Sequence, residues 1–209
     1  MRQVEALEFN VAQVLELIAD LELLLGQHDS LSERDDILPF FAARLDRVLS
    51  LGLLNPELAV PTCAAVELSL FGDFICDAVV GDSASQTFTF IEFEDAGPTS
   101  LFARAPGRGR RRPWGARFEK GFSQIVDWAW RLDDEGSSNA IETMLGCRNP
   151  AISYMLVIGR DTHLNDRDRD RLRWRAAHVG VKGARVNCMT FDRMLALLRA
   201  RALFATRRP

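Results

Sequence analysis

The sequence predicts an α/β fold in which helices flank a mixed β-sheet. Hydrophobic residues recur at helical spacing in several segments, whereas in shorter ones they alternate with polar residues or run without interruption. The predicted order is helix, helix, strand, strand, long loop, helix, strand, helix, strand, helix. Two consecutive strands favour an antiparallel hairpin, and strands separated by helices favour parallel pairing, so we expect a mixed sheet.

Two helices open the chain. We expect an amphipathic helix over residues 3–26, with Gly26 as its stop signal, and a polar linker over 27–33. The first helix is apolar enough to predict a role in oligomerisation. Ser32, followed by several acids, begins a second helix that runs to about Leu51. We therefore divide the chain into an N-terminal helical element, residues 1–30, and a main domain, residues 31–209.

A hairpin is predicted in the middle of the chain. Strands begin at about Ala64 and include an apolar run over 74–80 and an alternating strand over 87–95. Successive side chains of a strand point to opposite faces. One face of the second strand therefore carries two aromatic and then two acidic residues: Phe88, Phe90, Glu92 and Glu94.

The C-terminal half alternates helices and strands. It begins with a long loop over residues 96–114 that holds three prolines and an arginine-rich run. The pattern after the loop predicts a helix over 115–132, a strand over 151–159, a charged helix over 160–175, a strand over 184–190 and a closing helix capped by Thr190.

The composition is that of a globular protein, with 47% hydrophobic and 26% charged residues among 209. A net charge of −3 argues against a wholly basic nucleic-acid coat but allows a local basic groove. The four cysteines and three histidines lack zinc-ligand spacing. Because there is neither a signal-peptide pattern nor an apolar stretch of about 20 residues, we expect a cytoplasmic protein that has no membrane partner.

Carboxylates are predicted to converge at the hairpin. Asp77 interrupts an apolar strand, where a charge is costly unless it is paired or binds a metal. Across a hairpin it would face Glu92 and Glu94, and Glu67 is a candidate fourth acid. Converging acids repel one another, and Mg²⁺ or Mn²⁺ is the usual stabiliser. The alternatives are an arginine partner for Asp77 and a solvent-exposed strand end for the other acids.

Asp77, Glu92-x-Glu94 and Gln124 on the next helix together resemble the motif of the PD-(D/E)XK nuclease superfamily. Three blocks of the sequence, 72–81, 91–96 and 121–128, are similar to the C-terminal nuclease domain of the Shedu anti-phage defence proteins. The resemblance covers roughly residues 35–200.

This resemblance implies a PD-(D/E)XK-like fold that hydrolyses or nicks phage or plasmid DNA with Mg²⁺ or Mn²⁺, and it implies a homo-oligomer. Asp77 and Glu92 would be metal ligands, and Gln124 would orient a ligand, water or a phosphate. Glu94 falls where the superfamily usually has a lysine, so it either adds a metal ligand or leaves catalysis dependent on another cation. Lys120, one turn before Gln124, is the candidate for that cation.

Arginines of the long loop and the following helix are candidates for phosphate contacts in a DNA groove: Arg104, Arg108, Arg110, Arg111, Arg112 and Arg117. The alternative is a solvated loop. The alternating charges of residues 166–175 indicate a solvated helix with ion pairs. Two functional alternatives stay open: a catalytically silent fold that binds DNA or supports assembly, and DNA cleavage in restriction or repair.

Overall fold

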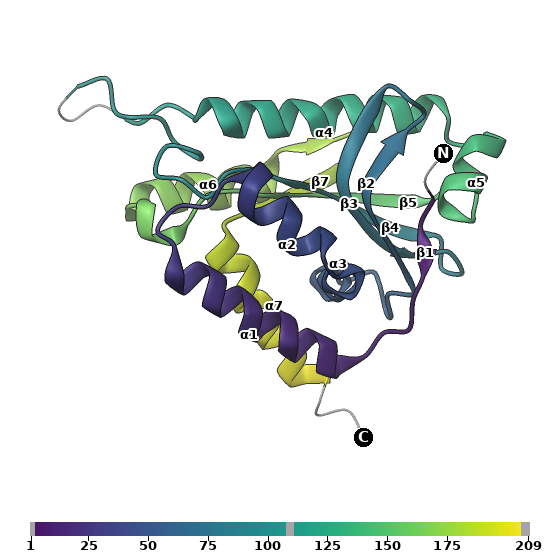
Figure 1. Cartoon of the computed structure of the whole chain (residues 1–209). Helices are drawn as coiled ribbons and strands as arrows, with labels where there is room; N and C mark the ends of the chain where they lie inside the picture. The colour runs from purple at the N-terminus through teal and green to yellow at the C-terminus, as the bar shows by residue number, and fades with distance from the viewer. Residues whose placement is uncertain (1–2, 108–110, 206–209) are drawn as a thin grey trace.

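The computed structural model describes residues 3–107 and 111–205 as an α/β fold with a seven-stranded mixed sheet between helices (Figure 1). The predicted fold class is confirmed. The strands are β1 (Glu5–Ala6), β2 (Cys63–Leu70), β3 (Phe74–Asp82), β4 (Thr87–Phe93), β5 (Ala151–Val157), β6 (Gly180–Val181) and β7 (Ala184–Met189). The helices are α1 (Val11–Gln27), α2 (Leu38–Ala42), α3 (Leu45–Leu51), α4 (Ala116–Asp134), α5 (Asn139–Leu145), α6 (Asp166–His178) and α7 (Phe191–Ala205).

The strand order is β1-β2-β3-β4-β5-β7-β6. The β3–β4 hairpin is antiparallel, and β5 and β7 add in parallel to β4, as the sequence predicts. Phe93 of β4 pairs with Val157 of β5, which pairs with Met189 of β7. The carboxyl ends of three strands therefore meet at one edge of the sheet, which is where open α/β sheets place their ligands.

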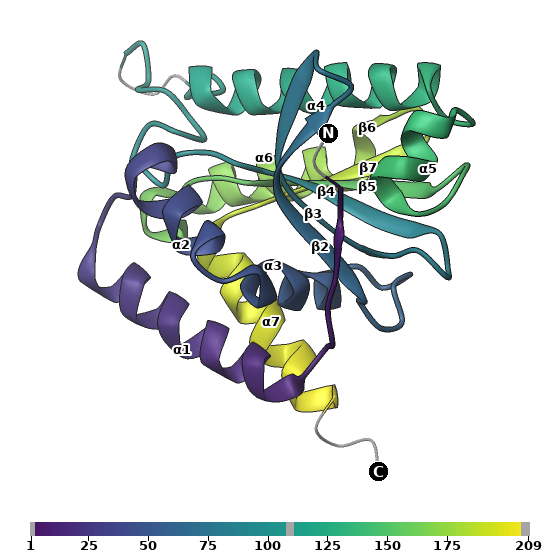
Figure 2. The ribbon, with the colours of Figure 1, turned by 45° about the vertical axis from the view of Figure 1, so that its right-hand side comes forward.

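The alternation of β4 divides its side chains between two cores. Phe88 and Phe90 pack against Trp128 of α4, whereas Ile91 and Phe93 belong to the core on the opposite face. All seven residues of β4 are buried. Figure 2 shows α4 on one side of the sheet and α1, α3 and α7 on the other. The predicted two-faced strand is thus confirmed, and its acids begin where its aromatic residues end.

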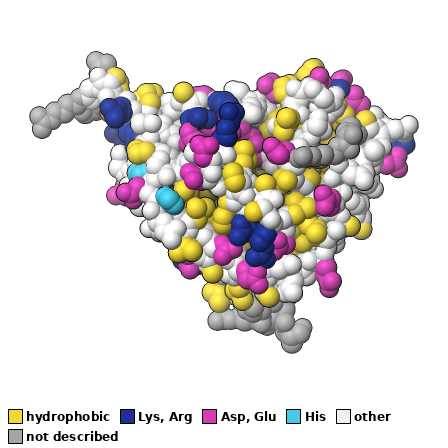
Figure 3. All heavy atoms as spheres, viewed as in Figure 1, with side chains coloured by type: hydrophobic (Ala, Val, Ile, Leu, Met, Phe, Trp, Pro, Cys, Tyr) yellow, Lys and Arg dark blue, Asp and Glu magenta, His cyan; other side chains and the backbone are white. Residues whose placement is uncertain are grey.

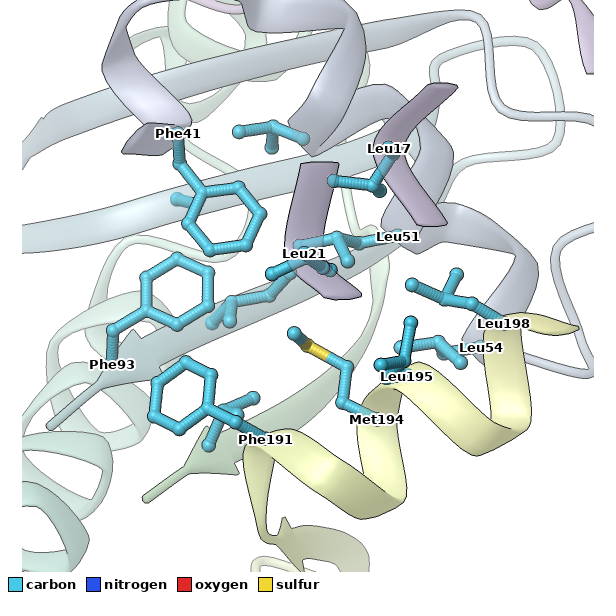
Figure 4. Close-up of a cluster of buried hydrophobic side chains, with 14 of the residues drawn as sticks. Leu17, Leu21, Phe41, Leu51, Leu54, Phe93, Phe191, Met194, Leu195 and Leu198 are labelled. Carbon is cyan, nitrogen blue, oxygen red and sulfur yellow. The ribbon is translucent and has the colours of Figure 1, made fainter. Parts of the chain in front are cut away.

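The N-terminal helix packs within this fold. Leu17 and Leu21 of α1 lie in one hydrophobic core with Met194 and Leu198 of α7 (Figure 4). Phe41, Phe93 and Phe191 continue this core toward the carboxyl ends of the strands. The apolar face of α1 is therefore used inside the chain. Its role in oligomerisation, and a separate element over residues 1–30, stay predictions.

Several boundaries differ from the prediction. The first helix begins at Val11 rather than residue 3, because the Asn10 side chain accepts a hydrogen bond from the Ala12 amide at 2.9 Å and caps it. The predicted second helix does begin at a Ser32 cap, but it is a π-helical turn (Glu33–Ile37) followed by α2 and α3, which are separated at Arg44, where φ is −148°.

The charged helix begins later than predicted, at Asp166, because Asn165 caps it. Helix α5 and the two-residue strands β1 and β6 were not predicted. All three are short elements that depend on what they pack against more than on their own periodicity. Across residues 3–107 and 111–205, none of the helices has the length and apolar character needed to cross a bilayer.

Candidate functional site

The β3–β4 hairpin brings Asp77 next to the acids of β4. Ala78 is paired with Ile91 in the antiparallel hairpin, so the neighbouring residues Asp77 and Glu92 lie next to that pair, one on each strand. The Phe93 amide donates a hydrogen bond to Oδ2 of Asp77 at 2.8 Å. This bond ties the Asp77 carboxylate to the backbone of β4, beside Glu92, and joins the first two residues of the predicted motif.

Helix α4 packs directly against the end of β4 at residue 121, which is glycine. A Cβ atom there would lie 2.9 Å from Cδ1 of Leu156 and 3.0 Å from Cγ of Glu94. Contacts that short are repulsive, so a larger residue would push α4 away from the sheet. Glu92 and Glu94, which are 1% and 0% exposed, are therefore enclosed between β4 and α4.

Two cations on the first turns of α4 contact Glu94. Nζ of Lys120 is 3.1 Å from Oε1 of Glu94, and Nη1 of Arg117 is 3.2 Å from Oε2. Both cationic side chains are about half exposed, at 49% and 46%. Asp77, Glu92 and Glu94 together with these two cations form what we call the acid cluster. In it Glu94 is buried, whereas the positive charges are accessible to solvent.

Glu33 is a further member of the cluster that the sequence analysis did not single out. Its Oε2 is 3.1 Å from Nη1 of Arg117 and 3.6 Å from Nζ of Lys120. Its backbone amide donates to Oδ1 of Asp95 at 2.8 Å, and Asp95 in turn pairs with Nε of Arg117 at 3.1 Å. The acids after Ser32 were the available signal, but they predicted only a helix start.

Burial changes the protonation of the acids. It is the largest cause that raises the pKa of Asp77 to about 7, although the Phe93 amide opposes the shift and the charge of Glu33 adds to it. Burial, with the charges of Asp77 and Glu94, raises the pKa of Glu92 to about 10. Burial also raises the pKa of Glu94 to about 7 against the stabilising bond from Lys120. The site therefore holds protons near neutral pH.

Two buried oxygens in this region have no hydrogen-bond donor within the described residues. They are Oε2 of Glu92 and Oε1 of Gln124. Gln124 lies one helical turn after Lys120 on α4, on the side that carries Gly121. Buried oxygens of this kind normally accept a hydrogen bond or bind a cation.

The metal ligands expected from the sequence fit this site in part. Glu92 offers an unsatisfied oxygen and Asp77 lies beside it, whereas Glu94 is already held by two cations. Glu67 is exposed on β2 with φ of 47°, and lines a cavity of about 350 Å³ together with Asp77 and Glu33. Within the described ranges, no three His, Cys, Asp or Glu residues are spaced to hold a metal ion.

The arginines expected to contact DNA occupy different environments. Arg104 and Arg111 are exposed, and Arg108 and Arg110 lie outside the described residues. Arg112 is bonded inward: its guanidinium donates to Asp168 and to four backbone carbonyls, those of Pro98, Phe102, Ala103 and His163. Because a guanidinium has five N–H donors, Arg112 has none left for a phosphate. Arg112 therefore acts in the fold.

Comparison with known proteins assigns the chain to a family. The sequence model of the family described as Shedu protein SduA, C-terminal, matches residues 30–195. The match begins just before Glu33 and includes all the acids of the cluster, the two cations and Gln124. No curated protein matches the chain.

Proposed function

Because the chain belongs to the Shedu family, we propose that it is a divalent-metal-dependent DNA nuclease that acts in bacterial anti-phage defence. One observation carries the proposal. Buried Glu92 has an oxygen with no donor, beside Asp77 and close to accessible cations. A site that only needed to be stable would not keep an acid cluster so poorly compensated.

Asp77 and Glu92 would hold Mg²⁺ or Mn²⁺, which take oxygen ligands. When bound, such an ion lowers the pKa of water and offsets negative charge on a scissile phosphate. The Phe93 amide fixes Asp77, and the close approach at Gly121 fixes Glu92 against α4. From its place on α4, the Gln124 amide would then orient the attacking water or a phosphate oxygen.

Lys120 would supply the cation that the motif lacks at position 94. Its ammonium is held by Glu94 at 3.1 Å while its side chain stays 49% exposed. An ammonium is a compact donor that can move from one anion to another, so Lys120 can transfer from Glu94 to a phosphate oxygen as negative charge develops there. In this proposal Glu94 positions Lys120 and is not needed as a metal ligand.

Cations at the mouth of the site would contact the DNA backbone. Arg117 is the nearest, and Arg104 and Arg111 lie exposed on the preceding loop. Basic and acidic side chains sit side by side in small groups on the face shown in Figure 3. Contacts to DNA would therefore be few and local, with a shallow dependence on salt.

A catalytically silent fold is the second candidate. It is favoured by the two cations that neutralise Glu94 and by the absence of a three-residue metal group in the described part of the chain. Such a module would bind DNA or support assembly without binding Mg²⁺.

Plasmid cleavage with Mg²⁺, Mn²⁺ or EDTA tests the proposal. We expect nicking or cutting by the wild type with a metal, and a loss of at least 100-fold in Asp77→Ala and Glu92→Ala. Asp127→Asn, an exposed change on α4, is the matched control and should cut normally. Cleavage that survives both site changes would remove the proposed site, and calorimetry without Mg²⁺ or Mn²⁺ binding would favour the silent fold.

Lys120→Ala tests the role of the lysine separately. We expect a loss of cleavage of 10-fold or more with unchanged metal binding, since Asp77 and Glu92 stay in place. Lys182→Ala is the control, because Lys182 pairs with Asp133 away from the acid cluster. A wild-type rate in Lys120→Ala would end this assignment.

A further inference from the structure

The charges of α6 are divided between two stripes of the helix surface. Arg169 is paired with Asp166 at 2.8 Å, and Arg173 is paired with Asp170. These pairs, each three residues apart, form the first stripe and are those expected of a solvated helix. They account for only part of the positive charge, because Arg167 is exposed and has no ion pair among the described residues.

The second stripe, which we call the α6 stripe, consists of Arg167, Arg171, Trp174 and His178. These residues recur at intervals of three or four, so they share one side of the helix. Trp174 is 62% exposed, and its ring stacks on that of His178 with centroids 4.8 Å apart. Nδ1 of His178 also lies 2.8 Å from the Trp174 carbonyl oxygen. The indole is therefore held in place while much of it faces solvent.

The loop before α4 adds a further arginine to the α6 stripe. Nη1 of Arg171 donates to the Arg112 carbonyl at 2.6 Å, which brings the neighbouring Arg111 to the cationic half of the stripe. Burial is the largest cause that lowers the pKa of Arg171, and the charge of Asp168 opposes the shift. The charges of Arg111 and Arg167 lower this pKa further, so both lie close enough to Arg171 to repel it.

The acids near the α6 stripe are already paired. Asp168 is nearly buried, and its Oδ2 lies 3.1 Å from Nη1 of Arg112. Glu119 of α4 lies 3.7 Å from Nη1 of Arg175. Positive charge is therefore in excess beside an exposed aromatic ring. A second copy of the chain would bring the same charges and be repelled, whereas a strand of nucleic acid offers phosphates for the guanidinium groups and bases for the ring.

The first turns of α4 lie between the α6 stripe and the acid cluster. Arg117 and Lys120 contact Glu94 on one flank of the helix. Glu119 contacts Arg175 of α6 on the other flank. A strand that crosses these turns therefore connects the two places.

We propose that the α6 stripe binds a single strand of DNA, with phosphates on Arg111 and Arg167 and an unpaired base stacked on Trp174. This inference rests on the proposed nuclease function and names its substrate class, which is DNA with a single-stranded segment beside the point of cleavage. In a duplex the bases are stacked on one another, so Trp174 contributes only to the binding of unpaired bases.

Fluorescence polarisation with a labelled oligothymidine of about 20 nucleotides tests the proposal on the full chain. EDTA is present, so binding is measured without cleavage. We expect saturable binding that Trp174→Ala weakens at least fivefold and that Trp174→Phe largely retains, because phenylalanine keeps a ring. Arg167→Glu should weaken binding at least 10-fold and reduce its dependence on salt. A duplex of the same length should bind equally to the wild type and to Trp174→Ala.

Phe204→Ala and Arg193→Glu are the matched controls. Phe204 is 71% exposed and Arg193 is exposed, and both lie on α7, which packs on the opposite face of the sheet from α6. Both variants should bind the oligothymidine normally. Wild-type affinity in Trp174→Ala, or an equal loss for the duplex, would overturn the proposal. Tighter binding of oligouridine would also overturn it, as would self-association that Trp174→Ala abolishes while oligothymidine binding is unchanged.

The binding assay separates this inference from the proposed function. Binding through the α6 stripe by a protein that never cuts plasmid DNA would refute the nuclease alone. Metal-dependent plasmid cleavage by a protein that does not bind oligothymidine would refute the α6 stripe alone.

Discussion

The acid cluster at the end of β4 and the interface between α4 and α6 use charge in opposite ways. At the interface, Trp114 stacks between Phe102 and Phe118, with ring centroids 4.5 Å apart on each side. Arg171 lies 5.0 Å from the Trp114 ring, and Arg175 lies 4.4 Å from that of Phe122. Arg112 completes the interface with its five inward bonds.

The difference lies in how completely each charge is satisfied. Every donor of Arg112 has an acceptor, and aromatic faces attract the guanidinium groups of Arg171 and Arg175, although buried Nε of Arg175 has no acceptor among the described residues. In the acid cluster, one oxygen of buried Glu92 has no donor, and three acids have raised pKa values. The bonds of Arg112 hold the fold together, whereas the buried Glu92 carboxyl keeps an oxygen free and holds its proton near neutral pH.

The largest effect on stability is expected at Arg112, whose donors are all bonded within the fold. Arg112→Ala would leave four carbonyls and nearly buried Asp168 without their donor, so we expect a loss of about 3 kcal/mol in the free energy of unfolding. Urea denaturation measures it. Exposed Arg111→Ala is the matched control and should change stability by no more than about 0.5 kcal/mol. Equal stability of both variants would contradict the structural role of Arg112.

A smaller effect of opposite sign is expected at Glu92. Its folded pKa is raised, so the folded state holds its proton more tightly than the unfolded state does. The metal-free protein should therefore lose stability as the pH rises from the unfolded pKa near 4.5 toward 8. Glu92→Gln removes this pH-dependent loss of stability. We expect the variant to be more stable than the wild type by about 2 kcal/mol at pH 8 and equally stable near pH 4.5.

Thermal denaturation over this pH range checks the prediction, and Mg²⁺ sharpens it. Added Mg²⁺ should raise the melting temperature of the wild type at pH 8 but not that of Glu92→Gln, because a carboxylate is needed to hold the ion. Asp127→Asn should follow the wild type in both respects. A wild-type pH slope in Glu92→Gln would show that this carboxyl does not control the cluster.

The smallest effect is expected for Arg175→Met. The change keeps an apolar stem against Trp114, Phe118 and Phe122 but removes the charge above their rings. We expect a loss of about 1 kcal/mol, typical of a partly buried cation–π contact. Chemical denaturation measures it, with exposed Arg173→Met as control. An increase in stability would mean that desolvation of the guanidinium outweighs its attraction to the rings.

Local pattern was sufficient for much of this protein. The alternation of residues 87–93 fixed which faces carry the aromatic residues and the acids, since strand geometry allows one arrangement. The Ser32 and Thr190 caps also depend only on neighbouring residues, and both occur. The spacing of Asp77, Glu92 and Gln124, read as a family resemblance, agreed with the match over residues 30–195.

Other features depended on contacts between distant residues. The break at Arg44 has no capping side chain to signal it, because packing decides it. Helix α5 does carry local signals that the prediction missed, the Ser138 cap and Gly146 in the left-handed region. Arg112 and Arg117 are five residues apart, yet one is fully bonded within the fold and the other stays half exposed beside the acids.

The sequence by itself determined the longer helices and strands, the two faces of β4 and the acids that follow its aromatic residues, because these depend on neighbours along the chain. The tertiary structure decided that Glu33 joins the cluster and that Lys120 and Arg117 hold Glu94. These features depend on contacts between segments that are distant in the sequence. At the site, α4 can approach β4 because Gly121 has no side chain.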